Sequence, residues 1–140
     1  MKVSDLMSRK LIVVAPDDPV ERAVKLLRYR GIRHLLVLQA GDLVGIISDR
    51  DVKRALDPGR GRKKKVMNIG GLFFLLEPVY VHEIMSRNVL SIGPGATARQ
   101  AAEMMVAERL GALPVVDKGK LVGILTETDL LRYLARRKRH

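Results

Sequence analysis

Two short motifs pair a hydroxyl side chain with an aspartate three residues later: Ser48 with Asp51, and Thr126 with Asp129. Each motif directly follows an apolar stretch typical of a strand, at a position where a helix would begin. A helix N-terminus presents unpaired N–H groups and the positive end of its dipole, which attract an anion such as a phosphate. The hydroxyl could bond that phosphate, and the carboxylate could accept hydrogen bonds from the hydroxyls of a ribose.

The same spacing has a purely structural explanation. A Ser or Thr followed three positions later by an acidic residue is a capping box, in which the two side chains bond free N–H groups at the start of a helix. Capping alone therefore accounts for both motifs. The spacing leaves the structural and the ligand-binding interpretations open.

Both motifs belong to a long internal repeat. The segment 3–56 aligns without a gap on 81–134, so residue n of the first copy corresponds to residue n + 78 of the second. A solenoid is excluded, because its units run roughly 20–50 residues and need at least three copies. We expect one module that pairs with itself, with a shared core and a ligand cleft between the halves. The predicted division is 1–56 as the first repeat, 57–80 as a linker, 81–134 as the second repeat and 135–140 as a basic tail.

Each repeat predicts a strand, a helix, two strands and a second helix, which is an α+β arrangement. In the first repeat, Asp18 and Glu21 predict a capping box before a helix that ends at Gly31. In the second repeat, Thr97 and Gln100 predict the corresponding cap. The second and third strands of each repeat should form an antiparallel hairpin. The strands are expected at 11–14, 34–38, 43–47, 90–92, 113–116 and 121–125.

Composition and motifs exclude several classes of protein. There is no cysteine, so there is no disulfide framework and no thiolate chemistry. No apolar run reaches the roughly 18 residues of a membrane span, and the N-terminus lacks the apolar core of a signal peptide. We therefore expect a cytoplasmic protein without a membrane partner. The histidines His34, His82 and His140 show no metal-ligand spacing, and no nucleophile–base pattern or glycine-rich phosphate loop occurs. We expect no enzymatic activity, no catalytic residue and no metal.

The net charge of +11 is the main compositional feature. Basic residues cluster at 60–65 and 136–139. These runs could be a solvated loop and tail, or they could attract a nucleotide phosphate or a nucleic acid. No aromatic residue is interleaved with them, which argues against a stacking platform for single strands. The apolar segment 70–78 could cover the seam between the halves or offer a patch to a partner or a second copy.

The order, spacing and duplication of several motifs together resemble the CBS domain family, named after cystathionine β-synthase. The resemblance is to a tandem pair of such domains, called a Bateman module, and it covers both repeats but not the linker or the tail. The motifs that carry it are Met7-Ser8 and Met85-Ser86, the segments 31–35 and 113–117, and both Leu-Val-Gly-Ile blocks with the Ser/Thr-x-x-Asp that follows each.

The resemblance implies a fold of two β-α-β-β-α units packed sheet to sheet with pseudo-twofold symmetry. It also implies two clefts that hold adenosyl ligands without covalent attachment: AMP, ADP, ATP or sometimes S-adenosylmethionine. Family members bind ribose through the aspartate that matches Asp51 and Asp129. They turn the hydroxyl that matches Ser48 and Thr126 towards the phosphate or the ribose. A hydroxyl of the first strand, which lies near the nucleoside in relatives, is matched by Ser91.

The first repeat departs from the family at two positions. Val13 replaces the first-strand hydroxyl residue, and Leu36 replaces the hairpin proline that is Pro114 in the second repeat. The first repeat also has Arg33 and His34, which match a basic pair that reaches phosphates in relatives. The two halves therefore look like unequal partners around a nucleotide.

These differences favour one good nucleotide site and one weaker or empty site. We expect the good site at Ser91, Thr126 and Asp129, with its phosphates drawn towards the basic pair of the first repeat. Arg50 could add positive charge there. Each arginine could equally belong to a solvated helix face, and His34 to a strand edge.

The leading hypothesis is therefore a regulatory module that senses energy charge by binding AMP, or else ADP or ATP. Without an attached effector domain, it would regulate a separate protein effector or its own association, and a homodimer is expected. The first alternative is a nucleic-acid-binding protein that uses the basic linker and tail. The second alternative is a structural dimerisation module in which both Ser/Thr-x-x-Asp motifs are only helix caps.

Overall fold

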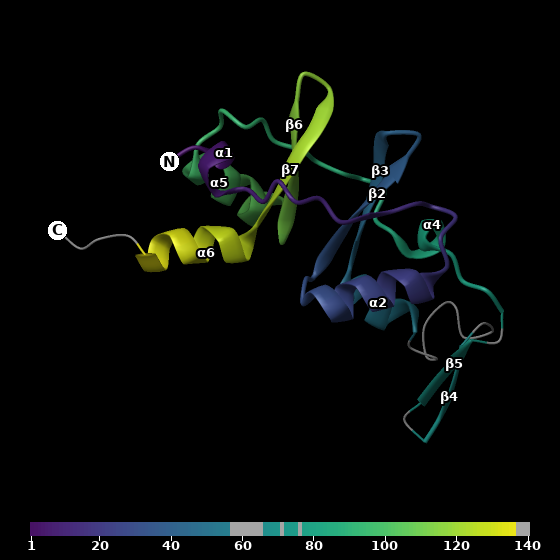
Figure 1. The fold of residues 1–140 in the computed structure, drawn as a ribbon. Helices are drawn as coiled ribbons and strands as arrows, with labels where there is room; N and C mark the ends of the chain where they lie inside the picture. The colour runs from purple at the N-terminus through teal and green to yellow at the C-terminus, as the bar shows by residue number, and fades with distance from the viewer. Residues whose placement is uncertain (57–65, 71, 76, 137–140) are drawn as a thin grey trace. The chain divides into compact units, whose positions relative to one another are not determined.

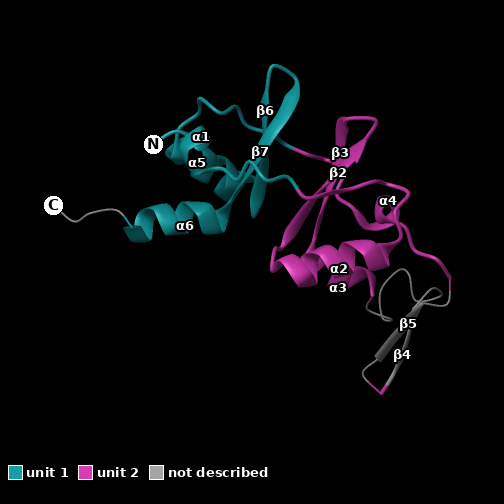
Figure 2. Ribbon diagram, in the orientation of Figure 1, with its two compact units in different colours: residues 1–11, 90–140 teal, residues 12–89 magenta. Residues whose placement is uncertain are grey.

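The protein has an α+β fold with small sheets and short helices, as expected. The computed structural model describes residues 1–56, 66–70, 72–75 and 77–136. The chain divides into two compact units (Figures 1 and 2): residues 1–11 with 90–140 form unit 1, and residues 12–89 form unit 2. The units therefore differ from the sequence repeats, because each unit includes the first short segment of the other repeat.

Unit 2 contains β1 (Val13–Val14), α2 (Val20–Arg30), β2 (His34–Gln39), β3 (Asp42–Ser48), α3 (Asp49–Ala55), β4 (Val66–Ile69), β5 (Leu72–Leu75) and α4 (Val81–Ile84). Its main sheet has the order β1-β2-β3, in which β1 is parallel to β2 and β2 is antiparallel to β3. The predicted hairpin is confirmed. The first strand covers only the last two residues of the predicted stretch 11–14.

Unit 1 contains α1 (Val3–Leu6), α5 (Ala98–Glu108), β6 (Ala112–Asp117), β7 (Lys120–Thr126) and α6 (Glu127–Arg136). Strands β6 and β7 form the second predicted hairpin. Equivalent elements start 78 residues apart, as the repeat predicts: α2 and α5 start at positions 20 and 98, and β3 and β7 start at positions 42 and 120.

The strand predicted at 90–92 is wrong, because only Ile92 pairs, in a single parallel bridge to Val115. The N–H of Ile92 donates to the carbonyl of Pro114 at 3.0 Å, and Val116 donates back to Ile92 at 3.0 Å. The next parallel step would need an N–H from residue 114 to the carbonyl of Leu90. Proline has no N–H to donate, so the ladder ends there.

The N-terminal caps of α2 and α5 differ, although the two helices start at equivalent positions of the repeats. Thr97 caps α5 as predicted: its Oγ1 accepts from the N–H of Gln100 at 3.0 Å, and Gln100 Oε1 accepts from the N–H of Thr97 at 2.9 Å. The capping box predicted from Asp18 and Glu21 is wrong. The N-cap of α2 is Pro19, one residue later, which leaves Asp18 outside the helix. Asp18 instead accepts from the N–H of Ala15 at 2.8 Å.

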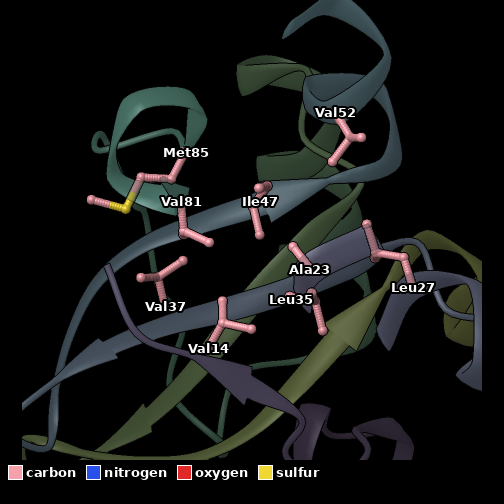
Figure 3. Packing of buried hydrophobic residues seen from close by; sticks show 9 residues of the cluster. All are labelled: Val14, Ala23, Leu27, Leu35, Val37, Ile47, Val52, Val81 and Met85. Atoms are coloured by element: carbon pink, nitrogen blue, oxygen red, sulfur yellow. The ribbon is translucent and has the colours of Figure 1, made fainter. Parts of the chain in front are cut away.

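Each unit has its own hydrophobic core, and each core combines residues of both repeats. In unit 2, α2 buries Ala23 and Leu27 against the sheet, and Val81 and Met85 of the second repeat complete the cluster (Figure 3). In unit 1, the completely buried Val3 of the first repeat takes the corresponding place. Each core therefore combines residues of both repeats, because the first helical segments are exchanged between them.

In each unit, the Met-Ser dipeptide that follows the exchanged helix packs against a glycine of the hairpin, and the contacts are equivalent in the two units. A Cβ atom on Gly123 would lie 2.6 Å from Met7 Sδ and 2.9 Å from the carbonyl oxygen of Ser8. A Cβ atom on Gly45 would lie 2.6 Å from Met85 Sδ in the same manner. Glycine is therefore required in both Leu-Val-Gly-Ile blocks, because the exchanged methionine lies where a side chain would begin.

Helices α2 and α5 both end at a residue with a left-handed backbone conformation, but the type of that residue differs. Gly31 ends α2 with φ 62°, as predicted, and the equivalent Arg109 ends α5 with φ 56°. Glycine adopts this conformation without steric cost, whereas arginine does not.

The linker contains the antiparallel pair β4–β5. The basic run at 60–65 lies outside the described residues, as does the tail after residue 136. Their predicted attraction of anions stays a prediction, and so does the role of the apolar segment 70–78 as a cover or a patch.

Candidate functional site

Both Ser/Thr-x-x-Asp motifs form complete capping boxes. Ser48 Oγ accepts from the N–H of Asp51 at 3.1 Å, and Asp51 Oδ2 accepts from the N–H of Ser48 at 2.9 Å. Thr126 and Asp129 repeat these bonds at 3.2 Å and 2.8 Å. The capping interpretation of the motifs is therefore confirmed. The capping bonds hold both side chains of each motif in defined positions.

The caps leave part of each carboxylate available. Among the described residues, only Oδ2 of Asp51 and of Asp129 accepts a hydrogen bond. Both side chains are partly buried rather than covered. The second oxygen of each aspartate can therefore accept from a ligand while the first maintains the cap. Capping and ligand binding are compatible at these residues.

The helix starts themselves have little room for an anion. The first N–H of α3, from Asp49, donates to the carbonyl of Arg33 at 3.0 Å, and that of α6, from Glu127, donates to Gly111 at 3.0 Å. The third N–H of each helix is bonded to the capping hydroxyl. Within the described part of the chain, only the second of these three N–H groups lacks an acceptor. The carboxylate oxygen is therefore the stronger ligand-binding feature.

In unit 1, the predicted site residues gather on one face of the sheet. The register pairs Pro114 with Ile124 and Ala112 with Thr126, and residues paired directly in this way share a face. Ser91 precedes the bridge of Ile92 to Val115, so it lies beside Pro114. The opposite face consists of core residues: Ile92, Leu113, Val115 and Leu125. The structure thus brings Ser91, Pro114 and Thr126 onto the other face of the sheet, with Asp129 on the helix that follows. Ser91 is exposed there and Thr126 is half-buried, whereas Pro114 is buried.

In unit 2, the equivalent face carries a different set of residues. His34 pairs with Ser48 across the hairpin, and Val13 pairs with Leu36. Arg33 precedes this strand and places its Nε 3.5 Å from Asp49 Oδ2 at the start of α3. Arg50 follows on the exposed side of α3. The structure therefore groups the predicted basic residues Arg33, His34 and Arg50 with Ser48 and Asp51 in this unit.

Sequence reasoning missed two further hydroxyls on these faces. Ser8 is the antiparallel partner of Ile124, and Ser86 is the partner of Ile46, each through a pair of backbone hydrogen bonds of 2.8–3.0 Å. Both serines therefore share the outward face of their sheet, and both are exposed. The repeated Met-Ser dipeptide was the signal for them, although the sequence does not say which hairpin each joins.

No group of three or more His, Cys, Asp or Glu side chains among the described residues could hold a metal ion. The helices in the described part of the chain are all too short or too polar to cross a membrane.

The family model described as "CBS domain" matches residues 3–58 and 81–136. The chain belongs to the CBS domain family. It is 34% identical over 134 residues to the uncharacterized protein MJ1225 of Methanocaldococcus jannaschii, covering 95% of this chain and 47% of that protein. It is 33% identical to a CBS domain-containing protein of Dictyostelium discoideum, covering 94% of this chain and 90% of that protein. The chain thus spans about half the length of the first relative and nearly all of the second.

The CBS pair fold is also shared with solved structures. The crystal structure of the CBS domain pair of protein MJ0100, in complex with methylthioadenosine and S-adenosyl-L-methionine, matches with a TM-score of 0.81 and 27% identity. The match covers 99% of this chain and 98% of that chain. The fold implied by the resemblance to CBS pairs is confirmed.

Proposed function

We propose that this CBS pair is a regulatory module that binds an adenine nucleotide, with AMP preferred and ADP and ATP as further ligands. The observation that carries the proposal is the sheet face of unit 1 opposite its core. There Ser91, Pro114 and Thr126 lie together, next to the carboxylate of Asp129 with one oxygen left to accept from a ligand. A ribose offers two vicinal hydroxyls that match such an acceptor.

The comparisons support the adenosyl part of the ligand. The MJ0100 pair was crystallised with two adenosyl compounds. The structure of MJ1225, with a TM-score of 0.76 to this chain, is described as that of a proposed archaeal homolog of g-AMPK. The choice of a phosphorylated ligand rests on this chain alone, whose net charge of +11 favours an anion over a neutral nucleoside.

We assign the ribose to Asp129 and Thr126, and contact with the nucleoside to Ser91 and Pro114. In unit 2, the equivalent position next to Ser48 and Asp51 has Val13 in place of a hydroxyl residue, so we propose a weaker site there. Arg33, His34 and Arg50 are proposed to bind phosphates, because they supply positive or titratable groups at the start of α3.

Such a module regulates by shifting an equilibrium, and a ligand shifts it only through unequal affinity for the two states. The proposed function includes no catalytic step. The outcome of binding would be a changed affinity for a protein effector or for a second copy of the chain.

Calorimetric titration of the purified protein tests the proposal. AMP, ADP, ATP, S-adenosylmethionine, methylthioadenosine and a short DNA duplex would each be titrated at moderate salt. We expect heat from AMP at the lowest concentration, and little dependence on salt compared with the duplex, whose binding to basic runs would weaken steeply with salt. Flat traces with all the adenosyl compounds would exclude the proposed function. Heat from the duplex alone would favour the nucleic-acid alternative.

A further inference from the structure

Helices α2 and α3 of unit 2 carry many exposed basic residues. The two helices contact each other and cover the same face of the sheet, because Ala23, Leu27 and Val52 share one core cluster with residues of the strands (Figure 3). Seven basic residues on these helices are exposed, and one of them, Arg50, is assigned to the nucleotide above. The other six, here called the basic face, are Arg22, Lys25, Arg28 and Arg30 of α2 and Lys53 and Arg54 of α3.

The second repeat shows that the fold does not need these charges. Of the six equivalent positions, 78 residues later, one is basic and two are acidic: Gln100, Glu103, Val106, Glu108, Leu131 and Arg132. Helices α5 and α6 nevertheless form at the positions equivalent to α2 and α3. Basic residues in the last turn stabilise a helix through its dipole, and Arg28 and Arg30 lie there in α2. The last turn of α5 contains no basic residue, so helix stability does not explain the basic face.

The charges of the basic face are largely uncompensated. Arg22 places its Nε 3.4 Å from Asp18 Oδ2, and 60% of the arginine side chain is exposed. The other five residues of the basic face form no ion pair with another described residue. On the two helices themselves, Glu21 is the only exposed acidic residue. Exposed charges of one sign on adjacent helices repel each other, and a bound polyanion relieves this repulsion.

An exposed tyrosine lies among these basic residues. Tyr29 is 81% exposed, and its equivalent in unit 1 is Ala107. Arg22, Lys25 and Tyr29 stand at helical positions i, i+3 and i+7, so they lie along one stripe of α2. Aromatic rings beside basic residues are typical of sites where an unpaired base stacks while the phosphates are neutralised. The bases of a duplex are already stacked on each other, and an acidic protein surface has none, so this combination favours a single strand.

We propose that unit 2 binds single-stranded nucleic acid across α2 and α3, with the basic face on the phosphates and Tyr29 on one base. The 11 residues of α2 span about 16 Å, which suits a short site of about four nucleotides. Leu35 and Ile47 face the helices in the core cluster, so the alternate residues His34 and Ser48 lie on the other face of the sheet. The nucleic-acid surface is therefore separate from the candidate nucleotide site, and the proposal does not depend on the proposed function.

Fluorescence anisotropy at several salt concentrations tests the proposal, with a labelled oligothymidylate of about 12 nucleotides. Lys25→Gln/Lys53→Gln should weaken binding about tenfold or more at low salt. It should also reduce the slope of log K against log salt by about 1.4, since each lost phosphate contact accounts for about 0.7. The matched control is Lys118→Gln/Lys120→Gln, which changes the net charge equally at the exposed turn between β6 and β7 and should have no effect.

Tyr29→Ala separates stacking from charge, because it places the alanine of unit 1 at the equivalent position of unit 2. It should weaken binding about fivefold or more at every salt concentration and leave the slope unchanged. An oligouridylate of the same length is titrated in parallel, and the tighter ligand identifies RNA or DNA as the preferred strand. AMP binding should be unchanged in all these variants, so failure of this proposal is distinguishable from failure of the proposed function.

Three results would overturn the proposal. The first is the absence of binding by the wild type at low salt. The second is tighter binding of a duplex of the same length together with no effect of Tyr29→Ala, which would exclude the single strand. The third is unchanged affinity in Lys25→Gln/Lys53→Gln, with loss of binding when the basic residues of 60–65 become glutamine or when the chain ends at residue 136. That result would assign binding to the basic runs. Thermal unfolding of each variant checks that these exposed substitutions leave the fold intact.

Discussion

Met7 packs on Gly123, so a methionine near the start of the chain occupies the space where a side chain of β7 would begin. Met85 packs on Gly45 in the same manner. The Met-Ser dipeptide and the Leu-Val-Gly-Ile block, which occur in each repeat, are thus the two sides of one packing contact. This contact joins the first segment of one repeat to the hairpin of the other.

Replacing Gly123 by Ala should destabilise the protein by about 1–3 kcal/mol, the usual cost of overpacking a well-filled site. The new Cβ would meet Met7 Sδ and the backbone oxygen of Ser8, and the backbone cannot move aside as a side chain can. Urea unfolding measures the loss. Gly95→Ala is the matched control, since a Cβ there would meet nothing within 4 Å, and it should be close to neutral.

A second substitution identifies the contact as the cause. Met7→Ala removes the thioether, so its combination with Gly123→Ala should cost less than the sum of the single changes. Strict additivity of the two losses would contradict the proposed contact.

Arg109→Gly should stabilise the protein by about 0.5–1 kcal/mol, because arginine is held at φ 56° where glycine is relaxed. The opposite change at the equivalent position, Gly31→Ala, should destabilise it by about 1 kcal/mol for the same reason. Thermal unfolding compares the two variants. A decrease in Tm for Arg109→Gly would show that the arginine side chain makes a stabilising contact that outweighs the strain.

Asp129→Asn separates the cap from the proposed ligand contact. The amide oxygen of asparagine can still accept from the N–H of Thr126, but the other carboxylate oxygen becomes an NH₂ group that cannot accept from a ribose. We expect the affinity for AMP to fall about tenfold or more, since a bond to a charged group is lost, while Tm changes little. Titration calorimetry and thermal unfolding together measure the two effects.

Thr97→Ala is the control for Asp129→Asn, because it removes a cap of the same type from α5. It should cost about 1 kcal/mol of stability and leave AMP affinity unchanged. Equal losses of affinity in both variants would mean that binding follows helix stability rather than the Asp129 carboxylate.

A chain that begins at Ile12 should lose the stability of unit 1 and keep that of unit 2. The deleted residues supply the buried Val3 and the packed Met7 to unit 1, whereas unit 2 contains none of them. Hydrogen exchange resolved by residue should show lost protection in β6 and β7 and retained protection in β2 and β3. Equal protection in both hairpins would contradict the exchange of segments between repeats.

Local patterns in the sequence were sufficient for most elements of the fold. The hairpins, the Thr97 cap and the helix end at Gly31 follow from residues close together in the chain. Two of the secondary-structure predictions were wrong, and the causes were local as well. The helix after Asp18 starts one residue later than the capping-box pattern indicates, and Pro114 lacks the N–H that a strand reaching Leu90 would need.

The exchange of segments could not be predicted, because the two repeats offer the same partners. Met7 could pack on Gly45 or on Gly123 with equal local chemistry, and nothing in either motif distinguishes them. The candidate site could be predicted only in part, because some of its geometry is local and some depends on pairing between distant segments. Each Ser/Thr-x-x-Asp motif fixed its own geometry, whereas the register that places Ser91 beside Pro114 depends on residues from separate parts of the chain.

The composition of unit 1 has a consequence for how the protein is made. Its core needs Val3 together with Leu125, which is synthesised much later. The segment 1–11 must therefore wait without its partners until β7 has been synthesised, whereas residues 12–89 can assemble earlier. Contacts of such high sequence separation slow folding, because the long loop must close before they form. We expect unit 2 to fold before unit 1 during synthesis.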